Sequence, residues 1–158
     1  MKQDRFLTGI LIGIGALVIV ALAVFFTRRD DQIYVADDTP EGVVHNYVVA
    51  VLDKDYHKAY RYLAELEHKP TLDEFQRAFL TSQVNPQGSA VEIGEAEISS
   101  NDVAFVEVAL VHNPSDPFST GYRDVQRAGL ILQNGAWKLT SMPSYYFCEY
   151  NWYQEPPK

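Results

Sequence analysis

The stretch TPEGVVHNYVVAVLDKDYHKAYRYL, residues 39–63, decides the fold. Thr39 and Pro40 are typical of a helix N-cap and of the first helical position. Apolar residues then recur at spacings of three, four and one, which places them on one helical face: Val43, Val44, Tyr47, Val48, Val51 and Leu52. Asp55 can cap a second helix, whose apolar face comprises Tyr56, Ala59, Tyr60 and Leu63. The stretch therefore predicts one helix to about Leu52 and a shorter one after it.

Downstream, residues 71–74 (TLDE) form a capping box that predicts a third helix with these residues directed inward: Leu72, Phe75, Phe79 and Leu80. After residues 85–88 the apolar period changes from about 3.6 to about 2, which predicts strands over about 91–98, 103–112 and 122–133. Asn134-Gly135 is a strong hairpin signal and predicts three cross-strand pairs: Gln133 with Ala136, Leu132 with Trp137, and Leu130 with Leu139. The expected fold class is α+β, with about three helices packed on an antiparallel sheet of about four strands.

Two of these motifs resemble the nuclear-transport-factor-2-like (NTF2-like) superfamily. Residues 55–60 (DYHKAY) are similar to its acidic-aromatic-x-x-Ala-Tyr turn between the first two helices, and residues 135–139 (GAWKL) to its last strand. The likeness covers about residues 39–142. It implies a curved sheet and helices that form a cone with a pocket at the wide end. Some members, such as ketosteroid isomerases and scytalone dehydratases, are enzymes, and many others only bind or assemble.

Toward the N-terminus, residues 6–26 (FLTGILIGIGALVIVALAVFF) contain no charged residue and one polar side chain, Thr8. As a helix they would rise about 31 Å, close to the hydrocarbon core of a bilayer at about 30 Å. We expect a membrane-spanning helix from Phe6 to Phe26, preceded by a short cytoplasmic tail (1–5) and followed by a polar linker (27–38) and one domain (39–158). The alternative is a cleaved secretory signal with a small-x-small site at 21–23, but the apolar run continues past that site.

Basic residues flank the apolar segment on both sides, so the positive-inside count is nearly a tie. A short tail before an uncleaved anchor usually stays in the cytoplasm, and we therefore expect a single-pass protein of the cell membrane with its domain outside. Gly9, Gly13 and Ala16 form a small-residue stripe that permits close approach of two such helices. A homo-oligomer formed through this stripe is a further expectation.

Charge and composition exclude several partners. From Ile33 onward there are 18 acidic and 9 basic residues, a formal charge of −9, which disfavours nucleic acid and anionic lipid head groups. Cys148 is the sole cysteine, so no intrachain disulfide can form, and we expect its thiol to be buried. The histidines of the helical part are not spaced to place two on one turn. We therefore expect no metal site and no cofactor.

The candidate pocket residues lie at strand ends. If the sheet curls as the resembled fold does, the apolar pairs of the hairpin lie on the concave face, and Tyr122, Asp124 and Gln126 continue that face toward the open end. His112 ends the apolar face of its own strand. Asp124 or His112 could act as a base and Tyr122 as a donor to an oxyanion. Polar residues at strand ends are also typical of simple contact with water, and the isomerases' own catalytic residues cannot be mapped onto this sequence.

The aromatic-rich C-terminal segment, residues 144–153 (SYYFCEYNWY), has two interpretations. In an extended conformation, side chains on one face would be Tyr146, Cys148, Tyr150 and Trp152. We expect this segment to pack on the domain with Cys148 inside. The alternative is an exposed patch that docks a partner or the bilayer interface, with Tyr146, Tyr150 and Trp152 as its contacts.

The sequence thus predicts a membrane-anchored, extracytoplasmic NTF2-like domain that acts as a non-catalytic binding or assembly module, with a protein partner or a second copy of itself. The alternative is a small pocket enzyme of the isomerase or dehydratase type, acting on an apolar substrate. A deep apolar pocket with an acid at its base would favour the enzyme.

Overall fold

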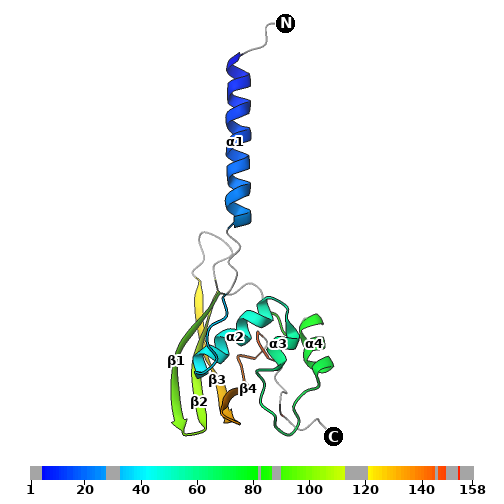
Figure 1. Cartoon of the computed structure of the whole chain (residues 1–158), viewed down its shortest axis with the longest axis vertical. Helices are drawn as coiled ribbons and strands as arrows, with labels where there is room; N and C mark the ends of the chain where they lie inside the picture. Colours follow the sequence, from blue (N-terminus) through cyan, green and yellow to red (C-terminus); the bar gives the residue numbers. More distant parts are fainter. Residues whose placement is uncertain are drawn as a thin grey trace. The chain divides into compact units, whose positions relative to one another are not determined.

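The computed structural model describes residues 5–27, 33–81, 83–86, 90–112, 121–144, 146–148 and 153. The chain divides into two compact units, Met1–Gln32 and Ile33–Lys158. In the first unit, α1 (Arg5–Thr27) is a helix of 23 residues (Figure 1). Its described side chains are those of residues 9–24, and large apolar ones among them, such as Leu17 and Ile19, are exposed. Judged on the described residues, none of the helices is both long and apolar enough to qualify as a membrane span.

The second unit begins with the three helices that the sequence predicts: α2 (Pro40–Leu52), α3 (Tyr56–Tyr60) and α4 (Leu72–Leu80). All three predicted caps are present. Thr39 Oγ1 accepts from the Gly42 N–H of α2 at 3.1 Å, and Asp55 Oδ1 caps α3. In the capping box of α4, the Glu74 N–H donates to Thr71 Oγ1 at 3.3 Å while Glu74 Oε2 accepts from the Thr71 N–H at 2.8 Å. Side-chain oxygens thus satisfy backbone donors that the first turn of a helix leaves without partners.

Two details of the helix prediction are wrong. Leu80 is 73% exposed, because the buried face of α4 is formed by Phe75, Ala78 and Phe79, and the next residue is rotated by about 100° away from it. Leu63 lies beyond the end of α3 rather than on its face. It forms a parallel β-bridge with Leu139 and is buried there.

The sheet has four antiparallel strands in the order β1-β2-β3-β4: β1 (Ala90–Ser100), β2 (Val103–His112), β3 (Tyr122–Gln133) and β4 (Ala136–Ser141). All three predicted pairs of the β3–β4 hairpin are present in the register. Asn134 and Gly135 both have positive φ, 52° and 78°, as a two-residue turn of this kind requires. The predicted α+β class and hairpin are confirmed.

We expected all three helices to pack on the sheet, and the structure differs from this expectation. α2 contacts β1, β2 and β4, whereas α3 packs against α2 and α4 against α3. Figure 1 shows α3 and α4 beside the sheet rather than over it. Aromatic contacts join α4 to α3 and α2. The centroid of the Phe75 ring lies 5.6 Å from that of Tyr60 and 6.5 Å from that of Tyr47. One helix covers the sheet and the other two extend the core sideways.

The described residues of the C-terminal segment pack on the domain, and residues 146–148 do so without forming a strand. Phe147 and Cys148 are adjacent and both buried, 0% and 4% exposed, and the Phe147 N–H donates to the Pro143 carbonyl at 3.0 Å. Adjacent residues of a strand point to opposite faces, so the predicted extended conformation is wrong at residues 146–148. The predicted burial of Cys148 is confirmed. Further on, the Tyr153 hydroxyl donates to the Ala64 carbonyl at 2.8 Å.

Two buried tyrosines predict how the domain responds to alkali. Burial raises the pKa of Tyr47 well above its usual value of about 10, and burial together with Glu65 raises the pKa of Tyr153. Since both pKa values are higher in the folded state, their contribution to stability is complete below about pH 10 and is lost as the pH rises further. We expect the free energy of unfolding, measured in urea, to fall above pH 10 by about 1.4 kcal/mol per pH unit for each tyrosine. Tyr47→Phe and Tyr153→Phe should each reduce this slope, and an unchanged slope in both variants would contradict the assignment.

Candidate functional site

The four predicted pocket residues lie together at the paired ends of β2 and β3. His112 and Tyr122 are partners in the register, and their rings stack with centroids 4.3 Å apart. On the same face of β3, Gln126 Nε2 donates to Asp124 Oδ2 at 2.7 Å. Tyr146, a candidate contact for a partner, approaches from the C-terminal segment with its ring 5.6 Å from that of His112. The other two aromatic candidates, Tyr150 and Trp152, lie outside the described residues.

The described side chains of this cluster differ in exposure, since His112 Nε2 is buried whereas the Tyr122 side chain is open to solvent. Tyr122 is 63% exposed, and none of the cavities described for this part of the chain is lined by Asp124 or His112. Burial, Tyr122 and the Asp124 carboxylate raise the pKa of the Tyr146 hydroxyl, which favours its neutral form. The arrangement is a stack of rings beside a hydrogen-bonded carboxylate at the border of the sheet. Its catalytic role stays a prediction.

Large side chains occupy the described interior between helices and sheet. Tyr47, Phe75 and Phe147 are fully buried there, and the Tyr47 hydroxyl donates to the Phe147 carbonyl at 2.6 Å. Asn46 is the one polar or charged residue that is buried among the described residues, so no carboxylate of this part lies in the core. Within the same ranges, no three side chains of His, Cys, Asp or Glu gather as a metal site would need. The described interior is a packed core.

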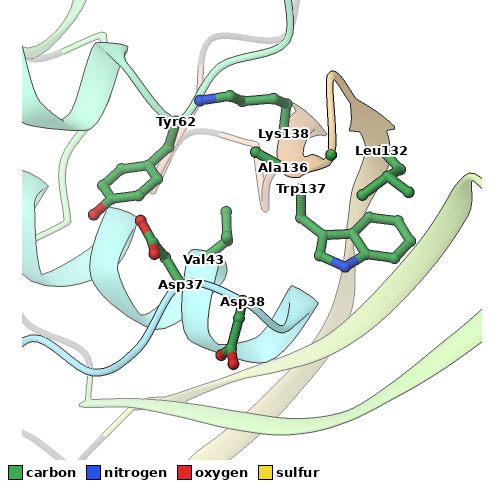
Figure 2. A pocket seen from close by; sticks show the side chains of 9 residues that line it. Asp37, Asp38, Val43, Tyr62, Leu132, Ala136, Trp137 and Lys138 are labelled. Carbon is green, nitrogen blue, oxygen red and sulfur yellow. The ribbon is translucent and has the colours of Figure 1, made fainter.

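A cavity of about 340 Å³ lies elsewhere, between the segment before α2 and the β3–β4 hairpin (Figure 2). Asp37 and Asp38 line it from the segment, Tyr62 from the chain after α3, and Trp137 and Lys138 from β4. The sequence reasoning missed this site, because it assigned both aspartates to a polar linker. Asn46 was the available signal, since a lone amide within an apolar helical run needs a buried partner.

That partner is the backbone of the segment. Asn46 Oδ1 accepts from the Val35 N–H at 2.9 Å, and Asn46 Nδ2 donates to the Val35 carbonyl at 2.8 Å. The amide thus makes the pair of bonds that a neighbouring strand would make. Gly42 permits the close approach, because a Cβ at this position would overlap the Ala36 carbonyl oxygen. Residues 33–38 are thereby held against α2, and this places Asp37 and Asp38 at the cavity.

The chain after α3, which carries Tyr62, and strand β4, which carries Lys138, are also held by hydrogen bonds. The Leu139 N–H donates to the Tyr62 carbonyl at 2.8 Å, and the Ala64 N–H donates to the Leu139 carbonyl at 2.8 Å, so the chain after α3 runs as a short extra ladder along β4. Lys138 Nζ donates to the Arg61 carbonyl at 2.8 Å. Burial and then Asp37 raise the pKa of the Tyr62 hydroxyl, so this hydroxyl stays neutral beside the carboxylate.

The small-residue stripe of α1 is compatible with its predicted role. A Cβ added at Gly9 or Gly13 would meet nothing within 4 Å. Open space beside both glycines is what an approaching helix would need. The association through Gly9, Gly13 and Ala16 stays a prediction.

Comparison with known proteins gives a likeness of fold. No protein-family model matches the sequence, and no curated protein matches it. Among solved structures, an NTF2-like protein of unknown function from Shewanella oneidensis MR-1 is similar, with 14% identity over 62% of this chain and 88% of that one and a TM-score of 0.44. A ketosteroid isomerase-like protein from Erwinia carotovora atroseptica SCRI1043 is similar with 18% identity over 70% of this chain and 92% of that one, at a TM-score of 0.42. At these scores we draw no functional conclusion from either.

Proposed function

We propose that this chain is a single-pass membrane protein whose NTF2-like domain lies outside the cytoplasm and binds or assembles with a partner without catalysis. One observation carries the non-catalytic part: the described core is filled by Tyr47, Phe75 and Phe147 and contains no carboxylate. Pocket enzymes need a cavity that buries most of the substrate beside a group with a perturbed pKa. A packed core without a buried carboxylate therefore fits a binding module better than a pocket enzyme.

The anchor is supported by the sequence and the helix of the N-terminal unit. Residues 6–26 carry no charge, and α1 has 23 residues, which rise about 34 Å. Its described large apolar side chains are exposed on every side, whereas a surface helix of a soluble domain has a polar face. A helix that is apolar all round needs burial in protein or in lipid, and a bilayer provides it at this length.

Membrane fractionation tests the location. We expect the full chain to stay in the membrane pellet after a carbonate wash, because an embedded helix is not extracted by high pH, and we expect external protease to remove the domain from intact cells. A chain that starts at Ile33 is the matched control and should appear in the soluble fraction. Release of the full chain by carbonate would contradict the anchor, and release of a mature chain starting near Val24 would show signal cleavage. Protection of the domain until the membrane is breached would reverse the orientation.

The same membranes test assembly. Solubilised in a mild detergent, the chain should migrate in a complex larger than one copy of 17.9 kDa, and crosslinking in intact membranes before extraction should capture the same complex. A single copy by both methods would contradict the assembly role.

A further inference from the structure

The cavity between residues 33–38 and the hairpin has the walls of a binding site. Its volume of about 340 Å³ falls in the range of small-ligand pockets, about 300–1,000 Å³. Figure 2 shows Tyr62 and Trp137 on opposite sides of it. The carboxylate of Asp37 is directed toward the hydroxyl end of Tyr62, whereas that of Asp38 lies over α2 at the border of the cavity and points away from the two rings. An aromatic ring on each side and acids from one edge are the components that select a positive charge carried on an apolar body.

The charge of the cavity is not neutralised from within. Lys138 contributes its stem to the wall, but its ammonium donates to the Arg61 carbonyl. Among the described residues, no cation lies within salt-bridge distance of Asp37 or Asp38. Two carboxylates against one lysine leave the site net negative, within a unit that is itself acidic. Cations are therefore favoured over anions at this position.

The walls are also preorganised. Asn46 fixes the segment that carries both aspartates, and the β-bridge of Leu63 with Leu139 fixes the chain that carries Tyr62. Trp137 lies next to the two-residue turn and pairs with Leu132 across the hairpin. A site whose parts are already held loses little conformational entropy when a ligand enters.

We propose that this cavity binds an organic cation, an ammonium or guanidinium group on a short apolar stem, with the carboxylate of Asp37 beside the charge, that of Asp38 at the border and the two rings enclosing it. The choice of ligand rests on the proposed binding role of the domain. The cation can belong to a basic side chain of a partner protein or to a free small molecule, and the chemistry at the site is the same for both.

Titration of the full chain in detergent, at constant ionic strength, tests this inference. The probes are butylguanidinium, choline and the uncharged isostere of choline, 3,3-dimethylbutanol. The readout is the fluorescence of Trp137 in a Trp152→Phe background, since the chain has two tryptophans. We expect saturable binding of both cations and a response to the alcohol at least about tenfold weaker, because the alcohol fills the cavity without the charge. Equal binding of the alcohol, or no saturable binding of either cation, would overturn the proposal.

Variants then locate the site. Asp37→Asn combined with Asp38→Asn should weaken cation binding at least about tenfold, while Glu67→Gln combined with Glu95→Gln removes the same charge from exposed positions outside the cavity and should change it little. Tyr62→Leu should weaken binding several-fold and Tyr62→Phe should restore it, since the ring and not the hydroxyl faces the cation. Equal effects of the two acid pairs would overturn the proposal.

A last pair of probes distinguishes the sources. A blocked Gly-Lys-Gly peptide that binds more tightly than butylammonium would identify a basic side chain of a partner protein, and the reverse order would identify a free small cation. Whichever of the two binds more tightly, saturable binding of either one requires a cation site. The membrane and crosslinking results do not depend on these titrations, so a failure of this inference and a failure of the proposed function are separate observations.

Discussion

Ending the chain after Met142 is expected to leave the Ile33–Lys158 unit unable to fold stably. This truncation removes Phe147, which is fully buried, and with it the carbonyl that accepts the Tyr47 hydroxyl at 2.6 Å. Loss of a buried Phe side chain costs about 3–5 kcal/mol, and a buried hydroxyl left without its acceptor costs about 1–3 kcal/mol more. Since domains of this size are stable by about 5–15 kcal/mol, the sum approaches the whole.

A point variant separates packing from chain length. Phe147→Ala keeps the backbone carbonyl and should lower the free energy of unfolding, measured by urea denaturation of the full chain in detergent, by about 3–5 kcal/mol. Phe105→Ala is the matched control, because this ring is 36% exposed on the outer face of the sheet, and its loss should cost distinctly less. Truncation with no loss of stability would mean that the C-terminal segment is not part of the core.

The second large effect is expected from Asn46→Leu. The substitution is close in volume, but it removes both bonds to Val35 and leaves a backbone N–H and a carbonyl without partners in a part-buried place. Each such group costs about 1–3 kcal/mol while it stays buried. We expect a loss of about 2–6 kcal/mol for the two groups together, or the release of residues 33–38 from α2. Limited proteolysis would detect the release as cleavage between Ile33 and Asp38.

His45→Ala supplies the comparison for this variant. His45 Nε2 lies 3.0 Å from the Ile33 carbonyl, on the same helix and against the same segment, but the contact is exposed to water. Water can replace it, so the loss should be small. If the two variants have equal effects, the buried amide is not what holds the segment.

How far the sequence predicts this fold depends on whether a signal is local. The hairpin register follows from Asn134-Gly135 and the alternation around it, and each helix cap lies within three residues of the donor that it satisfies. These features need no knowledge of distant contacts. They were all predicted correctly.

The errors arise where a distant contact decides. Alternation over residues 144–153 suggests a strand, but the interior accepts both Phe147 and Cys148, and a turn is the conformation that directs two adjacent side chains inward. The cavity was missed for the same reason, because Asp37 and Trp137, which both line it, are about a hundred residues apart in the sequence.

In the candidate site, one residue placement was predicted correctly from the sequence and another was missed. Alternation along β2 and β3 places His112 beside Tyr122, and the two lie in the register as the strand pattern suggests. Tyr146 was considered only as a contact for partners, but its ring lies beside that of His112. Its position depends on the turn at 146–147, which the apolar pattern of that segment does not reveal.

The double hydrogen bond of Asn46 also determines how the domain would respond to mechanical tension. Any pull transmitted through the chain from the N-terminal unit enters the domain at residues 33–35. It meets first the exposed contact of His45 with the Ile33 carbonyl and then the two bonds between Val35 and Asn46. We expect these two bonds to break before the packing around Tyr47, one residue further along α2, is strained, because they are part-buried whereas Tyr47 is fully buried. Tension would therefore separate the segment from α2 first. This would move Asp37 and Asp38 away from Tyr62 and Trp137 and open the cavity while the sheet and the core remain folded.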